Sequence, residues 1–267
     1  MALFDIKLFS TVLQTQTDIR VIIPTPDNNP DSRTTPYYDR NKRYQVLYLL
    51  HGATGDCTVW TRYSNVERYA QQYKLAVVCA SVGNSFYADM AHGRKYMTFM
   101  TKELPAFISH MFPVSDRRED TFIAGISMGG FGTYRLALEE PERFCCAASL
   151  SGALDVIAMA RMYANDPSGG LSDIFEPEDL KPGCDNDLPA LAGKRLAEGR
   201  ILPKLYQCCG TEDFLHGLNV SVRDRLKEQN VDLTYEESQG VHDWEYWDTQ
   251  IRRVLQWLPL AGTLVDV

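Results

Sequence analysis

The sequence predicts an α/β fold, with a mostly parallel central sheet of about eight strands and helices on both faces. Three observations support this prediction: short apolar runs recur along the chain, helix-like segments separate them, and a glycine-rich turn joins one run directly to a helix. Strands of a parallel sheet read as uninterrupted apolar runs, because helices cover both faces. The 267 residues are enough for one large core, so we expect residues 1–267 to form a single domain.

The elements are expected in a regular order. Residues 2–13 and 19–23 suit a hairpin, and the Pro-, Asn- and Asp-rich stretch 24–42 suits a loop. Further strands are expected at 44–50, 75–81, 120–126, 145–151, 205–209 and 232–236. Helices are expected at 65–73, 97–111, 130–138, 214–229 and 244–258. This alternation of strands and helices is the reason to expect parallel pairing.

Residues 155–200 interrupt the alternation. The segment contains Pro177, Pro189, the Pro182-Gly183 pair and the Asp-Pro-Ser-Gly-Gly run at 166–170, which is too many helix breakers for one long helix. A connection this long inside a compact domain usually has a function. We therefore expect a short irregular cap over the functional site, and the alternative is a surface insertion without a function.

The overall charge argues against one class of partner. The net charge is −8 and no cluster of Lys and Arg could neutralise phosphates, so we expect no nucleic-acid partner. Residues 1–13 lack a basic leader followed by an apolar run, and no stretch of about 18 apolar residues occurs elsewhere. We expect no membrane partner and a cytoplasmic protein. A homo-oligomer is possible, and the sequence leaves the oligomeric state open.

The cysteines predict neither a disulfide framework nor a zinc site. They are seven in number, which is odd, and they show no C-x-x-C spacing. Cys145, Cys146, Cys208 and Cys209 lie in strand-like runs, where a free cysteine is usually a small buried hydrophobe. We expect no metal ion and no organic cofactor.

Residues 125–129, Gly-Ile-Ser-Met-Gly, have the form G-x-S-x-G between an apolar run and a helix-like stretch. In this context the motif indicates a nucleophile elbow, a strained strand-to-helix turn that exposes the serine hydroxyl. The two glycines let the turn close, and the helix N-terminus favours a developing anion. The motif predicts Ser127 as a nucleophile, and the alternative is an ordinary Gly/Ser loop.

A serine hydroxyl needs a base at neutral pH, and imidazole suits that task. The chain has five histidines: His51, His92, His110, His216 and His242. His242 lies between the last expected strand and the final helix, at the carboxyl edge of the sheet, where the base belongs in this architecture. We therefore predict His242 as the general base.

The third member should be a carboxylate that follows an earlier strand and lies between the serine and the histidine in chain order. Asp213 lies where the strand at 205–209 gives way to a helix. It would orient the imidazole and stabilise the cation that forms on it. Glu212 and Asp155 are rivals, and Asp213 could also serve only as a helix N-cap.

A tetrahedral intermediate also needs N–H donors for its oxyanion. One should be the backbone N–H of Met128, directly after the nucleophile, and the second should come from the loop at 51–55, His-Gly-Ala-Thr-Gly. Within that loop we predict the N–H of Ala53, with Thr54 next. The histidine that begins the loop also fits a structural role in a tight turn.

Four further residues are predicted to line a substrate pocket. Trp60, Asn84, Phe86 and Tyr87 belong to loops that should open at the same edge of the sheet as Ser127. They could form an apolar slot with a polar rim for a small-molecule substrate, and ordinary loop packing is the alternative. Apolar residues at helical spacing over 244–258 are interpreted as the buried face of the last helix.

Four segments occur together in one order: H-G-A-T-G-D followed by Trp60, G-I-S-M-G-G-F-G, G-T-E-D-F-L and H-D-W-E-Y-W. With them, over roughly residues 3–258, the chain resembles the esterase D family of α/β-hydrolases. Within that family it looks most like bacterial tributyrin-type esterases, with S-formylglutathione hydrolases as more distant relatives. The resemblance implies the α/β-hydrolase fold and a triad acting on carboxylic esters, carried here by Ser127, Asp213 and His242.

The chain departs from the S-formylglutathione hydrolases at two places. Those enzymes usually have S-G-L-T-C where this chain has His-Gly-Ala-Thr-Gly at 51–55, and a histidine where it has Ile126. The departures argue against specificity for glutathione thioesters. We expect a serine carboxylesterase for short-chain acyl, acetyl or aromatic esters that acts through an acyl-enzyme. The alternatives are an acyltransferase with the same triad, an S-formylglutathione-type thioesterase and a non-catalytic binding protein.

Overall fold

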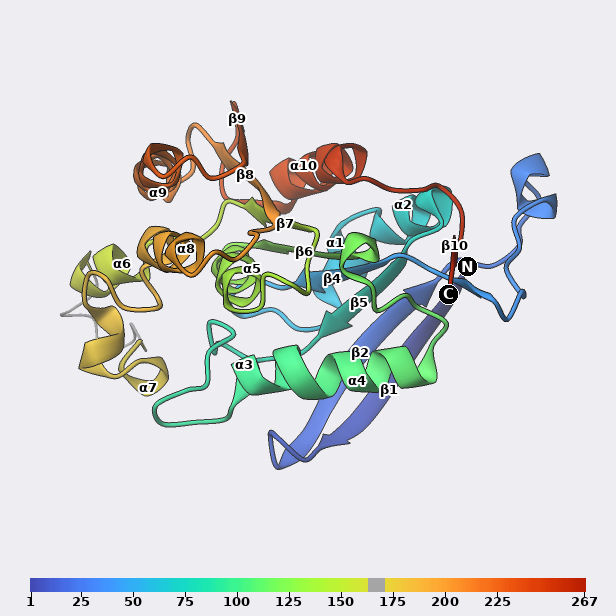
Figure 1. Cartoon of the computed structure of the whole chain (residues 1–267), viewed down its shortest axis with the longest axis horizontal. Helices are drawn as coiled ribbons and strands as arrows, with labels where there is room; N and C mark the ends of the chain where they lie inside the picture. The colour runs from blue at the N-terminus through green and yellow to red at the C-terminus, as the bar shows by residue number, and fades with distance from the viewer. Residues whose placement is uncertain (163–170) are drawn as a thin grey trace.

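The computed structural model describes residues 1–162 and 171–267, and its centre is an eight-stranded sheet (Figure 1). The strand order is β1-β2-β5-β4-β6-β7-β8-β9. The bounds are β1 Ala2–Ser10, β2 Thr15–Ile23, β4 Val46–Leu50, β5 Ala76–Ala80, β6 Thr121–Ile126, β7 Cys146–Leu150, β8 Lys204–Gly210 and β9 Leu233–Ser238. β2 pairs antiparallel with β1 and with β5, and the other neighbours are parallel. The predicted α/β fold is confirmed.

Helices cover both faces of the sheet. Their bounds are α1 Val59–Tyr63, α2 Val66–Tyr73, α3 Tyr96–Thr98, α4 Leu104–Met111, α5 Met128–Glu139, α6 Val156–Met162, α7 Leu171–Ile174, α8 Leu188–Ala197, α9 His216–Glu228 and α10 Trp244–Trp257. The short helices are η1 Pro30–Arg33, η2 Phe99–Glu103, η3 Arg118–Asp120 and η4 Pro177–Leu180, and a small ribbon joins β3 Lys42–Arg43 to β10 Val265–Asp266.

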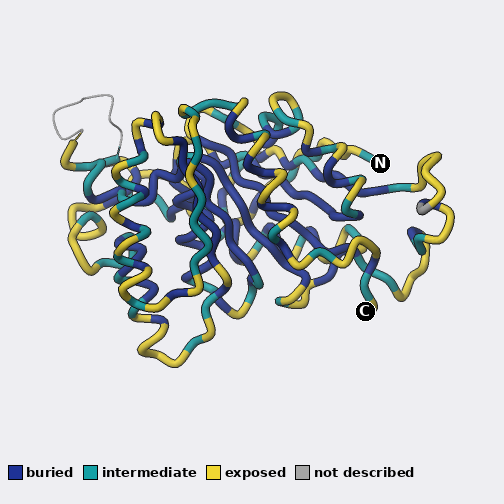
Figure 2. Tube along the Cα trace, turned by 90° about the horizontal axis from the view of Figure 1, so that it is seen from above, coloured by how far each residue is buried: buried dark blue, intermediate teal, exposed yellow. Residues whose placement is uncertain are grey.

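Strand β4 shows how side chains divide between the two faces. Val46, Tyr48 and Leu50 enter the apolar cluster that contains residues of α4, α5, α8 and α9. Leu47 and Leu49 enter the cluster that contains residues of α1, α2 and α10. Successive side chains of a strand point to opposite faces, so a strand covered on both sides must be apolar throughout. Figure 2 shows the resulting layer of buried strands between more exposed helices.

Two local features differ from the prediction. Helix α1 was not predicted, because its five residues are too few to show a helical period. The helix expected at 97–111 is continuous but contains the π-helical turn η2 between α3 and α4. Glu103, at the end of this turn, accepts hydrogen bonds from the N–H and Oγ1 of Thr11 at 2.7 and 2.8 Å. The π turn therefore fixes the tip of the β1–β2 hairpin.

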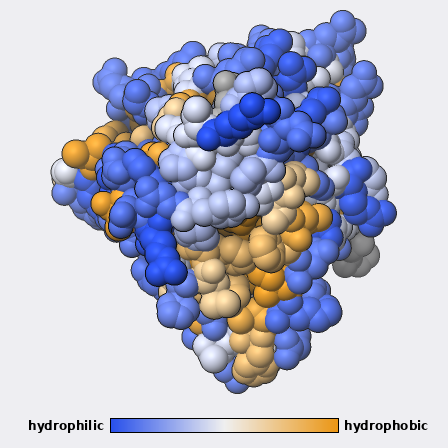
Figure 3. Space-filling model, turned by 90° about the vertical axis from the view of Figure 1, so that its right-hand side faces the viewer, coloured by the Kyte–Doolittle hydropathy of each residue, from blue (hydrophilic) through white to orange (hydrophobic). Residues whose placement is uncertain are grey.

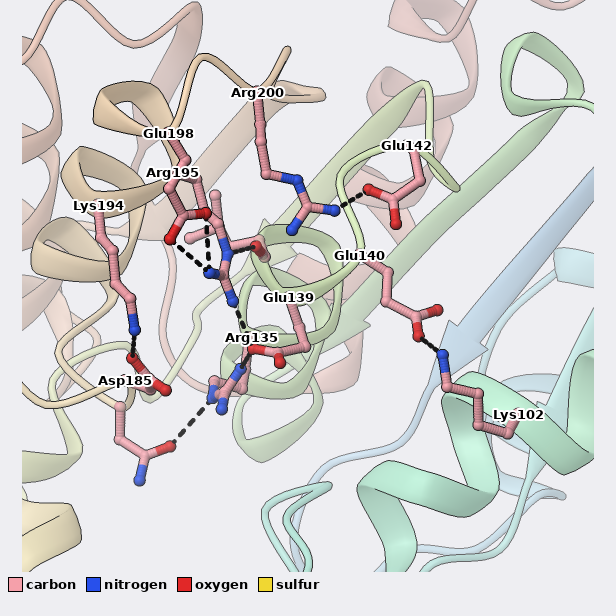
Figure 4. A network of polar contacts seen from close by, with 12 residues as sticks. Lys102, Arg135, Glu139, Glu140, Glu142, Asp185, Lys194, Arg195, Glu198 and Arg200 are labelled. Carbon is pink, nitrogen blue, oxygen red and sulfur yellow. Dashed lines mark hydrogen bonds and ion pairs between the residues drawn. The ribbon is translucent and has the colours of Figure 1, made fainter.

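Helix α8 lies inside the segment that was expected to be irregular. Arg195 of α8 donates to the carbonyl of Leu138 and to the carboxylate of Glu139, both at 3.0 Å (Figure 4). Arg135 of α5 donates to the same carboxylate at 2.6 Å. The prediction of one irregular stretch over 155–200 is therefore wrong for α8, which packs in the helix layer beside α5.

The helix breakers of this segment explain the error. Pro189 lies in the first turn of α8, where proline removes no helical hydrogen bond. The Asp-Pro-Ser-Gly-Gly run at 166–170 lies outside the described residues.

Within residues 1–162 and 171–267, no helix combines the length and the apolar character that a membrane span requires.

Candidate active site

Ser127 lies at the turn between β6 and α5. Its backbone has φ 52° and ψ −119°, a conformation that residues with a side chain rarely adopt. Backbone hydrogen bonds hold this turn: the N–H of Ser127 donates to the carbonyl of Leu150 at 3.0 Å. The carbonyl of Ser127 accepts from the N–H groups of Gly130 and Phe131 at 2.9 and 3.2 Å. The G-x-S-x-G segment thus forms a strand–turn–helix unit with Ser127 at its apex.

The glycines on either side of Ser127 are required by close packing. A Cβ atom at Gly125 would lie 2.4 Å from the carbonyl oxygen of Gly129. A Cβ atom at Gly129 would lie 2.6 Å from the carbonyl oxygen of His51 and 2.7 Å from that of Leu50. These atoms are backbone and have no freedom to rotate away. The turn can therefore close only where both positions lack a side chain.

The imidazole of His242 bridges Ser127 and Asp213. Its Nε2 lies 3.0 Å from Ser127 Oγ, and its Nδ1 lies 2.8 Å from Asp213 Oδ2. A carboxylate accepts the Nδ1–H, which leaves the lone pair of Nε2 directed at the serine hydroxyl. The three side chains follow β6, β8 and β9, and β7 separates β6 from β8 in the sheet. The sheet thus brings together segments 115 and 29 residues apart in the sequence.

Asp213 has a fully buried side chain. Burial alone would raise the pKa of its carboxyl group. The hydrogen bond with His242 and the one from the N–H of Leu215, at 2.9 Å, outweigh burial and hold the pKa below its ordinary value. The group is therefore ionised at neutral pH and can stabilise a positive charge on the imidazole.

The rivals of Asp213 are engaged elsewhere. Glu212 accepts a hydrogen bond from the N–H of Gly240 at 2.9 Å. Asp155 accepts one from the N–H of Ala158 at 2.8 Å and so caps α6. Asp213 itself uses Oδ1 for a local backbone N–H and Oδ2 for the imidazole, so its turn-capping and imidazole contacts use different oxygens.

His51 is buried and has the structural role that the tight turn suggested. Its Nδ1 lies 2.7 Å from the carbonyl oxygen of Gly52, and its Nε2 accepts from the N–H of Val82 at 3.2 Å. Burial lowers the pKa of the ring, so His51 is neutral and joins two loops. The other three histidines do not contact Ser127: His92 and His110 are exposed, and His216 pairs with Glu237.

Two backbone N–H groups near Ser127 are free to bind an anion. Within the part of the chain that the structure describes, neither Ala53 N–H nor Met128 N–H has a hydrogen-bond acceptor. The rival, Thr54 N–H, donates to the side chain of Asn84 at 2.7 Å. A Cβ atom at Gly52 would lie 3.3 Å from the Cβ of Ser127, so this loop lies against the serine.

A cavity of about 710 Å³ opens beside Ser127 and His242. Loop 52–58, helix α1 and the residues that follow Asp213 and His242 form its wall. Four aromatic side chains contribute: Tyr63, Phe214, Trp244 and Trp247. None of the described residues of segment 155–200 lines this cavity, so the predicted cap function remains a prediction. An aromatic wall with a few polar groups suits a small organic ligand.

Two of these rings contact the imidazole of His242. The ring centroids of Phe214 and Trp247 lie 4.7 and 4.9 Å from that of His242. Trp247 is 7% exposed and packs against Trp244 at 5.2 Å, whereas Phe214 is 66% exposed. The imidazole therefore contacts one buried ring and one ring that is largely exposed.

Three of the four predicted pocket residues are core residues instead. Trp60 is fully buried and donates its indole N–H to the carbonyl of Leu50 at 3.0 Å. Tyr87 is also fully buried, and its hydroxyl donates to the carbonyl of His51 at 3.0 Å. Phe86 is buried against two other phenylalanine rings. None of the three lines the cavity, because their loops fold inward. Asn84, the fourth, does not line it either, and its side chain accepts the N–H of Thr54 instead. Ordinary loop packing, the stated alternative, is what the structure shows.

The aromatic wall itself was missed. Trp244 and Trp247 were assigned only to the buried face of the last helix, yet both also line the cavity. Their position two and five residues after His242 was a usable signal, as was the position of Phe214 directly after Asp213. Tyr63 lies on α1, a helix that showed no sequence pattern.

Comparison with known proteins agrees with this geometry. The model of the Esterase family matches residues 24–258. The chain belongs to the Esterase family. Among its relatives, an acetyl esterase from Caldicellulosiruptor saccharolyticus is 32% identical over 264 residues, which cover 97% of this chain and 98% of that protein. The diacylglycerol acyltransferase/mycolyltransferase Ag85B of Mycobacterium leprae is 28% identical and covers 83% of this chain and 77% of its own length.

Two solved structures are similar to this chain both in sequence and in fold. The fluorophosphonate-binding serine hydrolase FphF of Staphylococcus aureus has a TM-score of 0.86 at 33% identity, covering 96% of this chain and 98% of that chain. The S-formylglutathione hydrolase FrmB of the same organism has a TM-score of 0.82 at 34% identity, with the same coverage. The protein is therefore a serine ester hydrolase with the α/β-hydrolase fold, and the predicted family and activity are confirmed.

Proposed function

We propose that Ser127, His242 and Asp213 are the catalytic triad of this esterase. The observation that carries the proposal is the continuous hydrogen-bonded chain from Ser127 Oγ through both ring nitrogens of His242 to Asp213 Oδ2. In it Ser127 is the nucleophile, His242 is the general base and Asp213 orients the ring and stabilises its cation. The N–H groups of Ala53 and Met128 hold the oxyanion.

The reaction proceeds in two halves. Ser127 Oγ attacks the ester carbonyl while its proton passes to His242 Nε2, and the tetrahedral oxyanion accepts hydrogen bonds from Ala53 and Met128. The intermediate collapses when His242 returns the proton to the leaving alcohol, which leaves an acyl group on Ser127. Water then attacks this acyl-enzyme with His242 as base. The carboxylic acid is released, and His242 returns a proton that regenerates the Ser127 hydroxyl.

We propose short-chain acyl esters, acetyl esters among them, as the substrates. The 32% identity with an acetyl esterase over nearly the whole chain supports a small acyl group. The cavity of about 710 Å³ next to Ser127 supports a larger alcohol part, which the aromatic wall can contact. The proposal includes aromatic esters. Hydrolysis rates measured on a panel of p-nitrophenyl, acetyl-sugar and hydroxycinnamoyl esters rank the three kinds of substrate.

We also propose a cytoplasmic location. All seven cysteines are free thiols, and most are buried. Disulfides are typical of oxidising compartments, and a chain with this many unpaired thiols suits a reducing one. Fractionation of cells that produce the protein, with markers for each compartment, tests the location.

The decisive test is Ser127→Ala. The variant should lose ester hydrolysis and labelling by a fluorophosphonate probe, while its circular dichroism stays that of the parent. Ser109→Ala, at an exposed serine of α4, is the matched control and should keep both properties. Full activity in a purified Ser127→Ala protein would refute the triad, and an unlabelled parent would favour a non-catalytic binding protein.

Acyl transfer is the second candidate, and the relationship with an acyltransferase favours it. The same acyl-enzyme would pass its acyl group to an alcohol instead of water. Water is present at about 55 M, so transfer requires a site that binds the acceptor well or excludes water. The ratio of transferred to hydrolysed product, measured with candidate acceptors, separates the two reactions, and S-formylglutathione as substrate tests the thioesterase alternative.

A further inference from the structure

The two edge strands of the sheet differ in charge. β9 forms one edge and carries Glu236 and Glu237, so a second β9 placed beside it would meet like charges. β1 forms the other edge and carries one acid and one base, Asp5 and Lys7. An exposed edge with unused backbone N–H and C=O groups is a template for pairing with another strand.

The β1 edge is also apolar for an exposed strand. Leu3, Phe4 and Phe9 are 40%, 42% and 55% exposed, and Met111 at the end of the neighbouring helix α4 is 58% exposed. Phe4 contacts Phe112 with ring centroids 5.3 Å apart. Figure 3 shows the apolar surface on the side of the molecule where this hairpin lies. Because successive side chains of a strand alternate, Leu3 and Phe9 lie on one face of β1 and Phe4 on the other, so exposed apolar side chains flank this edge on both faces of the sheet.

We propose that β1 is the interface of a symmetric dimer, in which β1 of a second copy pairs antiparallel with it. The two-fold axis passes midway between Ile6 of one copy and Ile6 of the other. Charge complementarity selects this partner. Asp5 of each copy lies opposite Lys7 of the other, and within one copy Asp5 pairs with Arg20 and Lys7 with Asp18, both at 2.6 Å. Pairing thus creates two rows of four alternating charges across four strands.

The register is fixed by two independent requirements. With the axis perpendicular to the sheet, directly opposed residues must lie on the same face. One residue must therefore oppose its own copy, and the axis runs through the position of that residue, midway between the two copies. An axis through Asp5 or Lys7 opposes two identical charges. An axis through Ile6 opposes unlike charges, aligns all nine residues of β1 and places Phe4 against Leu8 of the second copy. Length and charge therefore select the same register.

The hairpin is already ordered for this contact. All nine residues of β1 pair with β2, and β2 pairs with β5 inside the sheet. The carboxylate of Glu103 binds Ser10, Thr11 and the N–H of Val12 at the hairpin tip. An interface that is ordered before association loses little conformational entropy on binding. The dimer would continue the sheet from one copy into the next.

Analytical ultracentrifugation tests the proposal with two charge reversals. The parent should sediment as a species with twice the 30.3 kDa mass of the chain. Lys7→Glu places two acids opposite each other across the axis, and Asp5→Lys places two bases there. Each variant should raise the dissociation constant of the dimer about tenfold or more. An equimolar mixture should restore the dimer, because Lys at position 5 then faces Glu at position 7. Lys181→Glu, a distant exposed reversal, should leave it intact.

The mixing experiment makes the result specific. A variant that had merely lost its fold would not recover with the other variant, and esterase activity of each variant shows that it is folded. A parent that stays monomeric at all concentrations, a dimer that both reversals leave unchanged, or variants that do not associate on mixing would overturn the proposal. Binding of a monomeric parent to lipid vesicles would also overturn it.

Discussion

The hydrogen-bonded relay and the aromatic cavity wall meet at His242 but are built differently. Ser127 and Asp213 are held by backbone hydrogen bonds at strand ends, and the Asp213 side chain is fully buried. Phe214 and Tyr63, in the wall, are 66% and 52% exposed and are held by ring contacts. Changes to the relay should therefore abolish chemistry, whereas changes to the wall should alter binding only.

The largest effect is expected for His242→Ala. Without the imidazole no group takes the proton from Ser127, so kcat should fall by about 10⁶-fold, as when a triad base is deleted. Steady-state kinetics on a p-nitrophenyl ester measures it. His110→Ala, at an exposed histidine, is the control and should be fully active. A fall of only tenfold in the His242 variant would mean that another base serves Ser127.

Asp213→Asn should lower kcat by about 10⁴-fold, because the amide cannot hold the required tautomer or stabilise the imidazolium. Glu212→Gln is the matched control and should change kcat little. The pH dependence of stability gives a second readout. Because the folded pKa of Asp213 lies below the ordinary value of 3.8, the parent gains stability above that pH and loses this gain as the pH falls through the folded pKa. The asparagine variant should lack this loss in thermal unfolding below about pH 4.

Gly129→Ala tests the backbone that supports the relay. Its Cβ would lie 2.6 Å from a carbonyl oxygen, so the free energy of unfolding should fall by about 1–3 kcal/mol. Gly217→Ala in α9 is the control, since nothing lies within 4 Å of its Cβ, and it should be neutral or stabilising by less than about 1 kcal/mol. Equal urea midpoints for the two variants would contradict the close packing of the turn.

The smallest effect is expected for Tyr63→Ala in the wall. The KM for esters with a bulky alcohol should rise by about three- to tenfold, with kcat and the fold unchanged, because the lost contact is the same in ground and transition states. Tyr38→Ala, at a tyrosine that is 81% exposed and does not line the cavity, is the control. A large fall in kcat would show that the wall also positions the relay.

The same contrast explains what could be predicted from the sequence. The strands, Ser127, Asp213 and His242 follow from local rules, since each depends on an apolar run and the residue type at its end. The wall depends on how loops fold back on the sheet: Trp60 and Tyr87 turned inward to bond the carbonyls of Leu50 and His51. Such bonds join distant segments and leave no local pattern. Helix α1 was missed for a related reason, because five residues show no period.

The backbone of Ser127 also bears on the durability of the molecule. A side chain at φ 52° and ψ −119° costs about 1–3 kcal/mol that unfolding releases. Glycine would remove this burden and prolong the lifetime of the native state, but it would delete the hydroxyl on which turnover depends. At this single residue longevity and reactivity oppose each other, so heat-resistant versions of the protein must gain their stability elsewhere.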